Sequence, residues 1–373
     1  MATPPMRIGF PRMHLEPGER RDFLPRFLGR LARYGCQVFI EHGYGSGMNL
    51  TEDDYRSALP EVQFVERQAA FEQEYVIVLR YPGDESLHMM LPHSCLISML
   101  HYPTRPQRVE YLRSLALEAI SLDSLKDDSG RRIVENLRAV AWNGMQAAFQ
   151  ALAESYPYPG FTSPERQPLH VTLLGAGAVG MHVIQAATHY ANDALRKRLY
   201  SRGVPGVQVT VVDYDLTGHG RIMQEILART DILVDATQRP DPTQPVIPNE
   251  WMAWLPQHAV LVDLSVDPYD CDNGSVKGLE GIPQGNLDQY IFAPDDPAYL
   301  NIPACVPTRH RRYALSCYSW PGVHPEPCME VYGKQLQPVL RTLIERNGIQ
   351  NIRPNGKFFE RAIARAQLSR WQP

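Results

Sequence analysis

A glycine-rich turn with the sequence LLGAGAVG carries the clearest chemical signal in the chain. An apolar run precedes the turn and a helical pattern follows it, which is the order found in dinucleotide-binding units. In such a unit Gly175 permits the tight turn, Gly177 lets a pyrophosphate approach the backbone, and Gly180 lets the helix pack closely on the strand. Ala178 and Val179 lie in the first turn of that helix and complete the predicted phosphate-binding residues.

A second apolar run, at residues 207–212, ends on Asp213. An acid in this place accepts hydrogen bonds from the adenosine ribose hydroxyls, which favours NAD over its 2′-phosphorylated form. Asp213 lies 33 residues beyond Gly180 (213 − 180), whereas about 20 residues are usual for this fingerprint. The extra length falls in the basic stretch 192–207, which we expect to form a longer helix and a surface loop.

Three further side chains have types suited to binding and proton transfer: Arg20, Arg80 and His101. A guanidinium group offers a carboxylate two parallel N–H donors, which a lysine cannot copy. Histidine exchanges a proton near neutrality because its ordinary pKa is about 6.5. Two of these residues also have a structural alternative, since Arg20 could be an exposed arginine at a helix start and His101 could be a structural or surface histidine.

Apolar runs that alternate with helical patterns predict parallel sheets covered by helices. The expected strands are residues 7–10, 37–40, 75–79, 95–100, 117–121, 171–174, 207–212, 231–235 and 259–263. The expected helices are residues 21–34, 136–154, 181–190, 328–346 and 358–371. A Pro/Gly-rich passage at 156–164 is the best candidate for a linker.

These elements predict an α/β protein with two Rossmann-like, doubly wound domains. The last helices cannot form a domain alone, so we expect them to return to the N-terminal domain and make it discontinuous. The predicted substrate domain comprises residues 1–150 and 322–373, and the predicted dinucleotide-binding domain comprises residues 151–321.

The composition is ordinary for a globular protein of 373 residues with a formal net charge of −4. This charge gives no general attraction to nucleic acid or to anionic membranes. No apolar stretch reaches the roughly 18–20 residues that a membrane helix needs. Because the first residues run directly into a strand pattern, we expect no signal peptide. The six cysteines are widely spaced and include no C-x-x-C pair, so we expect reduced thiols in a cytoplasmic protein and no zinc site.

Several motifs together resemble one family along nearly the whole chain. They are IGFP at 8–11, ERR at 19–21, VLRYP at 78–82, SMLHYP at 98–103, VDLSVD at 262–267 and YSWPGVHP at 318–325. The family is that of alanine dehydrogenase, the transhydrogenase α-subunit and the lysine-forming saccharopine dehydrogenase. Its members have an N-terminal substrate domain, a central nucleotide domain and a C-terminal helix that returns to the first domain.

The resemblance implies a role for four of the residues. Arg20 stands where the family has an arginine that grips the substrate carboxylate. Arg80 replaces the usual lysine, and it can still bind a carboxylate but cannot lose a proton at working pH. His101 would contact the carbonyl or imine group as an acid or hydrogen-bond donor, and Asp267 would lie near the nicotinamide, where it orients His101 or takes part in proton transfer.

Two further stretches depart from the commonest family pattern. Ser319 and Trp320 replace an Asn-Met pair in the turn that flanks the nicotinamide, so we expect a bulkier wall there. The segment 126–132, KDDSGRR, resembles saccharopine dehydrogenase more than alanine dehydrogenase, although its charge alone favours a solvated hairpin.

The resulting hypothesis is an NAD-dependent oxidoreductase acting on the C–N bond of an amino acid or secondary amino acid. Its partners would be a small amino acid or 2-oxo acid and further copies of the chain, with no nucleic acid, membrane or metal ion. A nucleotide-binding module that passes hydride to a partner, like the soluble arm of a transhydrogenase, is the alternative. A sensor of the nicotinamide ratio is a third possibility.

Overall fold

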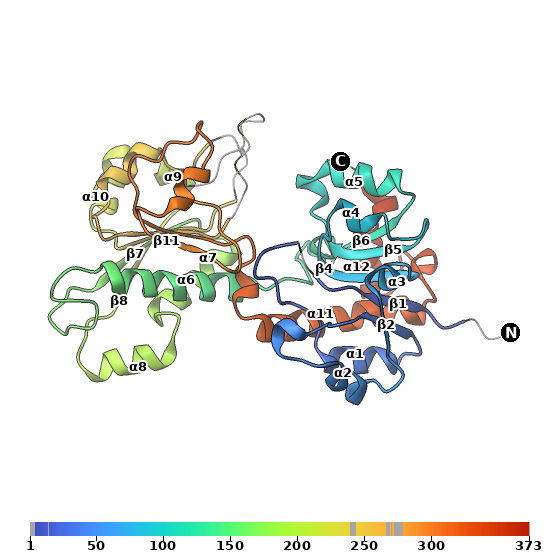
Figure 1. Cartoon of the computed structure of the whole chain (residues 1–373). Helices are drawn as coiled ribbons and strands as arrows, with labels where there is room; N and C mark the ends of the chain where they lie inside the picture. Colours follow the sequence, from blue (N-terminus) through green and yellow to red (C-terminus); the bar gives the residue numbers. More distant parts are fainter. Residues whose placement is uncertain are drawn as a thin grey trace. The chain divides into compact units, whose positions relative to one another are not determined.

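The computed structural model of the chain describes residues 4–13, 15–238, 244–265, 269, 271 and 279–372. The chain divides into two compact units, of which the first comprises Met1–Asn136 and His324–Pro373 and the second comprises Leu137–Val323. Figure 1 shows the blue N-terminal and red C-terminal elements within the same unit. The predicted α/β fold with a discontinuous first domain is therefore confirmed.

The first unit is built on a six-stranded parallel sheet with the strand order β3-β2-β1-β4-β5-β6. Its strands are β1 (Arg7–Phe10), β2 (Gln37–Glu41), β3 (Gln63–Val65), β4 (Tyr75–Arg80), β5 (Cys95–Met99) and β6 (Glu118–Ser121). The chain winds outward from β1 to β3 and then outward from β4 to β6 on the other side. Ligands of such sheets bind where the winding reverses, beyond the carboxyl ends of the strands.

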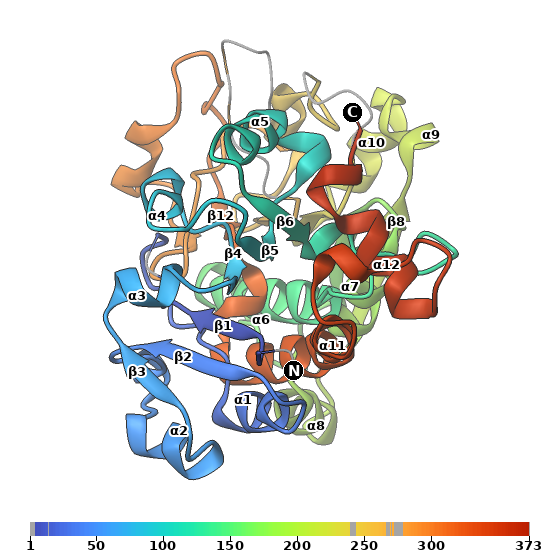
Figure 2. The same ribbon diagram turned by 90° about the vertical axis from the view of Figure 1, so that its right-hand side faces the viewer.

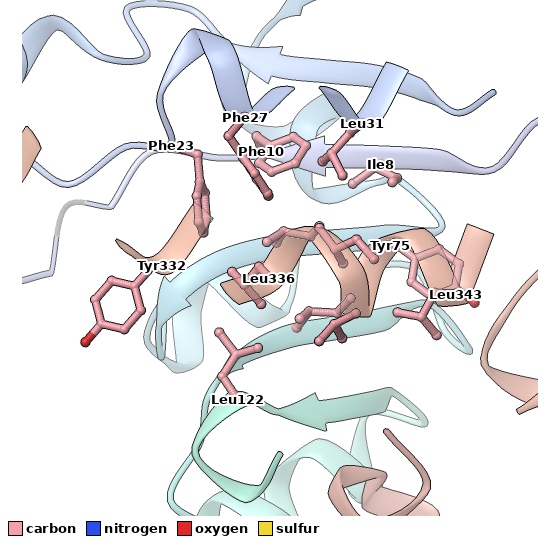
Figure 3. Packing of buried hydrophobic residues seen from close by; sticks show 14 of the residues in the cluster. Ile8, Phe10, Phe23, Phe27, Leu31, Tyr75, Leu122, Tyr332, Leu336 and Leu343 are labelled. Carbon is pink, nitrogen blue, oxygen red and sulfur yellow. The ribbon is translucent and has the colours of Figure 1, made fainter. Parts of the chain in front are cut away.

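Helices from both ends of the sequence cover this sheet. They are α1 (Pro25–Ala32), α2 (Glu52–Ala58), α3 (Arg67–Phe71), α4 (Asp84–Leu87), α5 (Pro106–Ser114), α11 (Pro325–Glu345) and α12 (Phe358–Ala366). In Figure 2 the red helix α11 lies near α1, with which it is in contact. Apolar residues of β1 (Ile8, Phe10) and of α11 (Leu336, Leu343) are buried in one core, which Figure 3 shows. The C-terminal helices thus complete the hydrophobic core of the first unit.

The second unit contains another six-stranded sheet, in the order β11-β12-β10-β9-β7-β8. Its strands are β7 (Leu169–Leu174), β8 (Val207–Val212), β9 (Ile232–Asp235), β10 (Val260–Asp263), β11 (Ile291–Phe292) and β12 (Tyr313–Ser316). Only the β11–β12 pairing is antiparallel among the described strands. The chain passes from β7 to β8 on one side and then crosses to β9 on the other, so the glycine turn after β7 lies where the winding reverses.

The helices of the second unit correct two expectations. They are α6 (Leu137–Ser155), α7 (Ala178–Thr188), α8 (Asp193–Ser201), α9 (Tyr214–Thr217) and α10 (Gly220–Leu227). The predicted boundary at residue 150 falls inside α6, whose buried side chains join the core of the second unit. The stretch after α7 forms a separate helix, α8, instead of a longer α7, because Tyr190 and Ala191 adopt positive φ angles of 52° and 46° and the Asn192 side chain caps α8.

The cysteines depart from the expectation of six reduced thiols. Cys271 and Cys305 form a disulfide with a Cα–Cα separation of 6.3 Å, although 34 residues separate them in the chain. Cys36, Cys95, Cys317 and Cys328 are free thiols. Spacing along the sequence could not reveal the pair, because only the folding of the second unit brings the two segments together.

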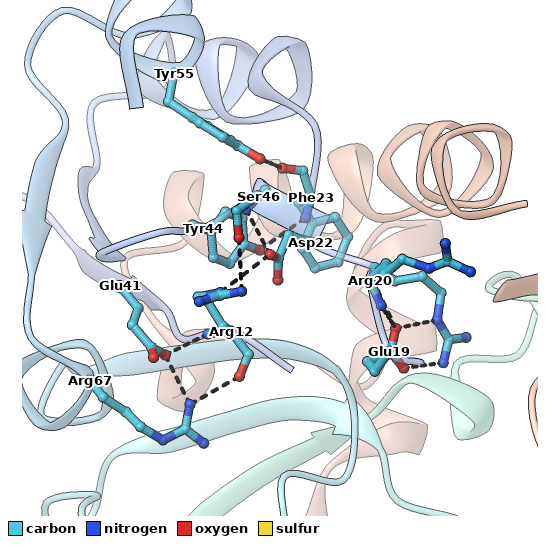
Figure 4. A network of polar contacts seen from close by, with 12 residues as sticks. Arg12, Glu19, Arg20, Asp22, Phe23, Glu41, Tyr44, Ser46, Tyr55 and Arg67 are labelled. Atoms are coloured by element: carbon cyan, nitrogen blue, oxygen red, sulfur yellow. Dashed lines mark hydrogen bonds and ion pairs between the residues drawn. The ribbon is translucent and has the colours of Figure 1, made fainter. Parts of the chain in front are cut away.

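A polar network anchors the segment between β1 and α1, which carries several candidate site residues (Figure 4). Asp22 is 5% exposed, accepts a hydrogen bond from Gly45 N at 2.7 Å and lies 4.0 Å from the Arg12 guanidinium. The N–H of Phe23 donates to the Tyr44 hydroxyl at 3.0 Å. These contacts hold the irregular segment against the loop that follows β2.

Asp22→Asn is expected to stabilise the protein more at pH 8 than at pH 5. Burial raises the pKa of Asp22 from 3.8 to about 7, although the Gly45 N–H and Arg12 act in the opposite direction. Since the folded-state pKa lies above the unfolded value, ionisation costs stability progressively as the pH rises from about 4 to about 7. The free energy of unfolding of the variant relative to wild type should therefore rise by about 2–3 kcal/mol between pH 5 and pH 8.

Urea unfolding at the two pH values measures this difference. The control is Asp53→Asn, which removes a carboxylate whose side chain is 88% exposed and should show the same difference from wild type at both pH values. The prediction would be contradicted if the free energy of unfolding of Asp22→Asn relative to wild type were the same at pH 5 and pH 8.

Candidate active site

The carboxyl ends of three neighbouring strands in the first unit carry Arg80, His101 and Asp123. Arg80 is the last residue of β4 and is paired in register with Met99 of β5, two residues before His101. Ser98 of β5 is in register with Ser121 of β6, two residues before Asp123. The parallel register therefore brings a cation, a histidine and an acid to the same edge of the sheet.

The Asp123 carboxylate contacts both the backbone and the imidazole side chain of His101. Asp123 Oδ1 accepts hydrogen bonds from Leu100 N at 3.0 Å and from His101 N at 3.1 Å. Asp123 Oδ2 lies 3.6 Å from His101 Nδ1. These bonds hold His101 in the left-handed region, with φ 54°, which non-glycine residues adopt only where the surroundings favour it.

The environment of His101 favours its neutral form at neutral pH. Desolvation lowers the pKa of His101 below 6.5, Asp123 opposes this shift, and three arginines (Arg132, Arg108 and Arg105) reinforce it. The imidazole side chain remains 46% exposed, so a ligand can reach it. A neutral, accessible imidazole beside a buried carboxylate is suited to take up a proton.

Arg80, at the end of β4, lies in a cluster with charged residues of the segment before α1. Glu16 forms ion pairs with Arg80 and, at 3.8 Å, with Arg21. Arg21 is buried and its guanidinium makes two bonds to Glu19, from Nε at 2.8 Å and from Nη2 at 2.5 Å. Two guanidinium groups and two carboxylates thus lie together beside the end of β4.

Arg20, the predicted carboxylate-binding residue, lies outside this cluster. Its N–H donates to Glu19 at 2.9 Å, but its side chain is exposed and its stem lies against Gly47. Among the ion pairs of the described residues, it is Arg21, and not Arg20, that shares the partner Glu16 with Arg80. Arg20 as a substrate ligand therefore stays a prediction.

The glycine turn in the second unit has the geometry that a pyrophosphate site needs. Gly175 has φ +88°, a conformation that other residues rarely adopt. A Cβ on Gly180 would lie 2.3 Å from Gly175 O, whereas a Cβ on Gly177 would meet nothing within 4 Å. Gly177 is the N-cap of α7, and Ala178 and Val179 form the first turn of that helix. The helix N-terminus is therefore open for an anion to approach.

Asp213 lies at the carboxyl end of β8, next to β7 in the sheet. Its side chain is exposed and caps α9 by accepting a hydrogen bond from Tyr214 N at 2.8 Å. The carboxylate remains accessible for a ribose hydroxyl in spite of the long connection from α7, because α8 takes up the additional residues. The described residues therefore leave room for a dinucleotide, and the contacts of Asp213 with the ribose and of the first turn of α7 with the phosphates stay predictions.

Two predicted cofactor contacts are buried. Trp320 is 1% exposed and Ser319 is 7% exposed. The Trp320 indole N–H donates to Asp263 O at 2.9 Å, and its backbone O accepts from Asn143 Nδ2 at 2.8 Å. The structure thus places the Trp320 side chain in the core of the second unit, so the expected aromatic wall is not formed by this ring. Asp267 lies outside the described residues.

The segment 126–132 is a hairpin with an antiparallel bridge between Lys126 and Arg132, and its exposed Asp128 pairs with Arg361 and Arg365 of α12. Within the described ranges no group of three or more metal-ligating side chains occurs. No helix of the described chain has the length and apolar character of a membrane span.

Sequence reasoning missed Asp123 and Glu16. Asp123 directly follows the expected strand at 117–121, and an acid after a strand in a parallel sheet is a recognisable signal. Glu16 had no such signal, because it lies in an irregular segment whose path only the folded structure shows.

Comparison with known proteins agrees with this architecture. Residues 14–141 match the family model described as "Alanine dehydrogenase/PNT, N-terminal domain". The alanine dehydrogenase of Mycolicibacterium smegmatis is 22% identical over 341 residues, covering 85% of this chain and 86% of the relative. The NAD(P) transhydrogenase subunit alpha of Haemophilus influenzae is 20% identical over 382 residues, covering 93% of this chain and 68% of the relative.

A solved structure of L-alanine dehydrogenase has the same fold, with a TM-score of 0.72 at 19% identity, over 97% of this chain and 94% of that chain. The family match lies in the unit that carries Arg80, His101 and Asp123. The resemblance to the alanine dehydrogenase and transhydrogenase family is therefore confirmed, and the chain has the two-domain fold of an alanine dehydrogenase.

Proposed function

We propose that this protein is an NAD-dependent oxidoreductase that acts on the C–N bond of an amino acid. The observation that carries the proposal is the arrangement of His101, Asp123 and Arg80 at one edge of the first sheet. The dinucleotide cradle after β7 supports it, and bound NAD would accept or supply a hydride. The accessible carboxylate of Asp213 favours NAD over the 2′-phosphorylated cofactor.

In the oxidation of an amino acid, three residues of the first unit would have separate roles. Arg80 would bind the substrate carboxylate and hold the reacting carbon in place. Once the substrate ammonium group has lost a proton to solvent, loss of hydride from its carbon gives an iminium group, to which water adds. His101, neutral at working pH, would take the proton from that water, and Asp123 would hold the imidazole and stabilise its cationic form. His101 would return this proton to the nitrogen and then take up the proton of the adjacent hydroxyl group, so that ammonia leaves and the 2-oxo acid remains. Loss of that proton from His101 to solvent would restore the neutral imidazole.

The test is a screen of 2-oxo acids with ammonia or amino acids, following the absorbance of NADH and, separately, of NADPH. Oxidation of NADH with at least one pair supports the proposal, and the relatives favour a small amino acid such as alanine over saccharopine. NADH binding without turnover of any pair would overturn it. That result would favour the second candidate, a hydride-passing module, which the similarity to a transhydrogenase alpha subunit suggests.

Two further parts of the proposal concern the protein's surroundings. A homo-oligomer is expected from the family resemblance. The expected cytoplasmic location loses the support of the cysteine pattern, because Cys271 and Cys305 form a disulfide. Both stay predictions, and light scattering on the purified protein measures the first of them.

A further inference from the structure

Glu16 forms an ion pair with Arg80, the residue that would bind the substrate carboxylate in the proposed function. Its carboxylate pairs with the Arg80 guanidinium and lies 3.8 Å from that of Arg21. The Glu16 side chain is only 10% exposed. The Glu16 carboxylate is therefore paired with the same guanidinium group that a substrate carboxylate would need.

The two acids of the cluster are held very differently. Glu19 accepts four hydrogen bonds, two from the Arg21 guanidinium and two from the N–H groups of Arg20 and Arg21. The Glu16 carboxylate has ion pairs but no hydrogen-bond partner for its buried Oε1 among the described residues. A buried carboxylate with incomplete hydrogen bonding is weakly stabilised, so Glu16 is the acid that a ligand can displace.

The local backbone gives Glu16 room to move without disturbing the core. Glu16 lies in the irregular segment between β1 and α1, and Gly18, with φ +74°, separates it from Glu19. Residues 21–24 beyond Glu19 are buried. Displacing Glu16 would therefore affect one turn of surface chain, while Arg21 would keep its bidentate partner.

We propose that Glu16 is an internal competitor that occupies Arg80 until a substrate carboxylate displaces it, and so determines the affinity for acidic substrates. The inference rests on the proposed role of Arg80. An incoming carboxylate gains only the difference between its own pairing with Arg80 and that of Glu16. Glu16 thus raises the KM for the acid without touching the atoms that react.

The experiment is calorimetric titration of pyruvate, the simplest 2-oxo acid, into wild type and Glu16→Gln, with and without NAD. Glutamine keeps the size of Glu16 but removes the charge, so the dissociation constant is expected to fall about tenfold, the equivalent of one charge-assisted hydrogen bond. Adding Arg80→Gln to this variant should abolish the gain. Glu16→Asp, whose shorter carboxylate reaches Arg80 less well, should lie between wild type and Glu16→Gln.

Glu85→Gln is the matched control, because Glu85 is an exposed acid of α4, five residues after Arg80, with no described ion pair. It should leave pyruvate binding unchanged. Unchanged pyruvate binding in Glu16→Gln, with a lower unfolding temperature, would overturn the inference and make the pair purely structural. Tighter binding without turnover of any acid and amine would support the competitor and count against the proposed reaction, so the two failures are distinguishable.

Discussion

His101→Asn is expected to lower kcat for amino-acid oxidation by about 10²–10⁴-fold, the usual contribution of a positioned general acid or base. The imidazole is the accessible proton acceptor at the edge where Arg80 and Asp123 also lie. Asparagine tolerates a positive φ about as well as histidine, so the turn after β5 should survive. NADH binding, measured by fluorescence titration, should not change, since the glycine turn belongs to the other unit.

The opposite end of the same strand provides a control for the backbone. His93 precedes β5, has φ 66° and is exposed. His93→Asn makes the same substitution in the same backbone conformation but at the amino end of the strand, and it should retain full activity. Equal activity of the His93→Asn and His101→Asn variants would show that His101 takes no part in proton transfer.

Asp123→Asn separates the positioning of His101 from its chemistry. The amide oxygen can still accept the N–H groups of Leu100 and His101, but the negative charge is lost. Because that charge raises the pKa of His101, the pKa that His101 contributes to the pH profile of kcat/KM should move further below 6.5 in the variant. A structural defect alone would lower the activity without moving this pKa.

The strand ends of this protein could be predicted from its sequence, whereas the pairing of side chains across them could not. Apolar runs mark β4, β5 and β6, so the sequence predicts that Arg80 and His101 lie at the carboxyl edge of a sheet. It does not identify Asp123 as the partner of His101, because the family resemblance points to Asp267 instead. The register that aligns Ser98 with Ser121 is a long-range property, and no local pattern specifies it.

The segment before α1 shows a second reason why the site could not be predicted fully from the sequence. The helical pattern at 21–34 predicts a helix that begins at Arg21, but α1 begins at Pro25 and residues 21–24 form a buried, irregular segment. Proline favours the first turn of a helix, and the buried pairing of Arg21 with Glu19 stabilises the segment before it. Burial of Arg21 and exposure of Arg20 follow from that local conformation, which the helical pattern concealed.

Gly180→Ala is expected to destabilise the second unit by about 1–3 kcal/mol, the usual cost of overpacking a tight contact. A Cβ at this position would lie 2.3 Å from Gly175 O, and backbone cannot move aside as a flexible side chain can. Either α7 must shift away from β7 or the turn must deform, and both changes disturb the predicted phosphate site. Thermal unfolding should show a lower midpoint, and NADH should bind more weakly in fluorescence titration.

Gly177→Ala, three residues earlier in the same turn, separates folding from binding. Its Cβ would meet nothing within 4 Å and its φ of −69° suits alanine, so the unfolding midpoint should stay at the wild-type value. NADH binding should nevertheless weaken, because the methyl group would stand where the pyrophosphate approaches the N-terminus of α7. Unaltered binding in a stable Gly177→Ala protein would mean that the space beside Gly177 is not used by a dinucleotide. The three glycines would then be explained by the packing of α7 on β7 alone.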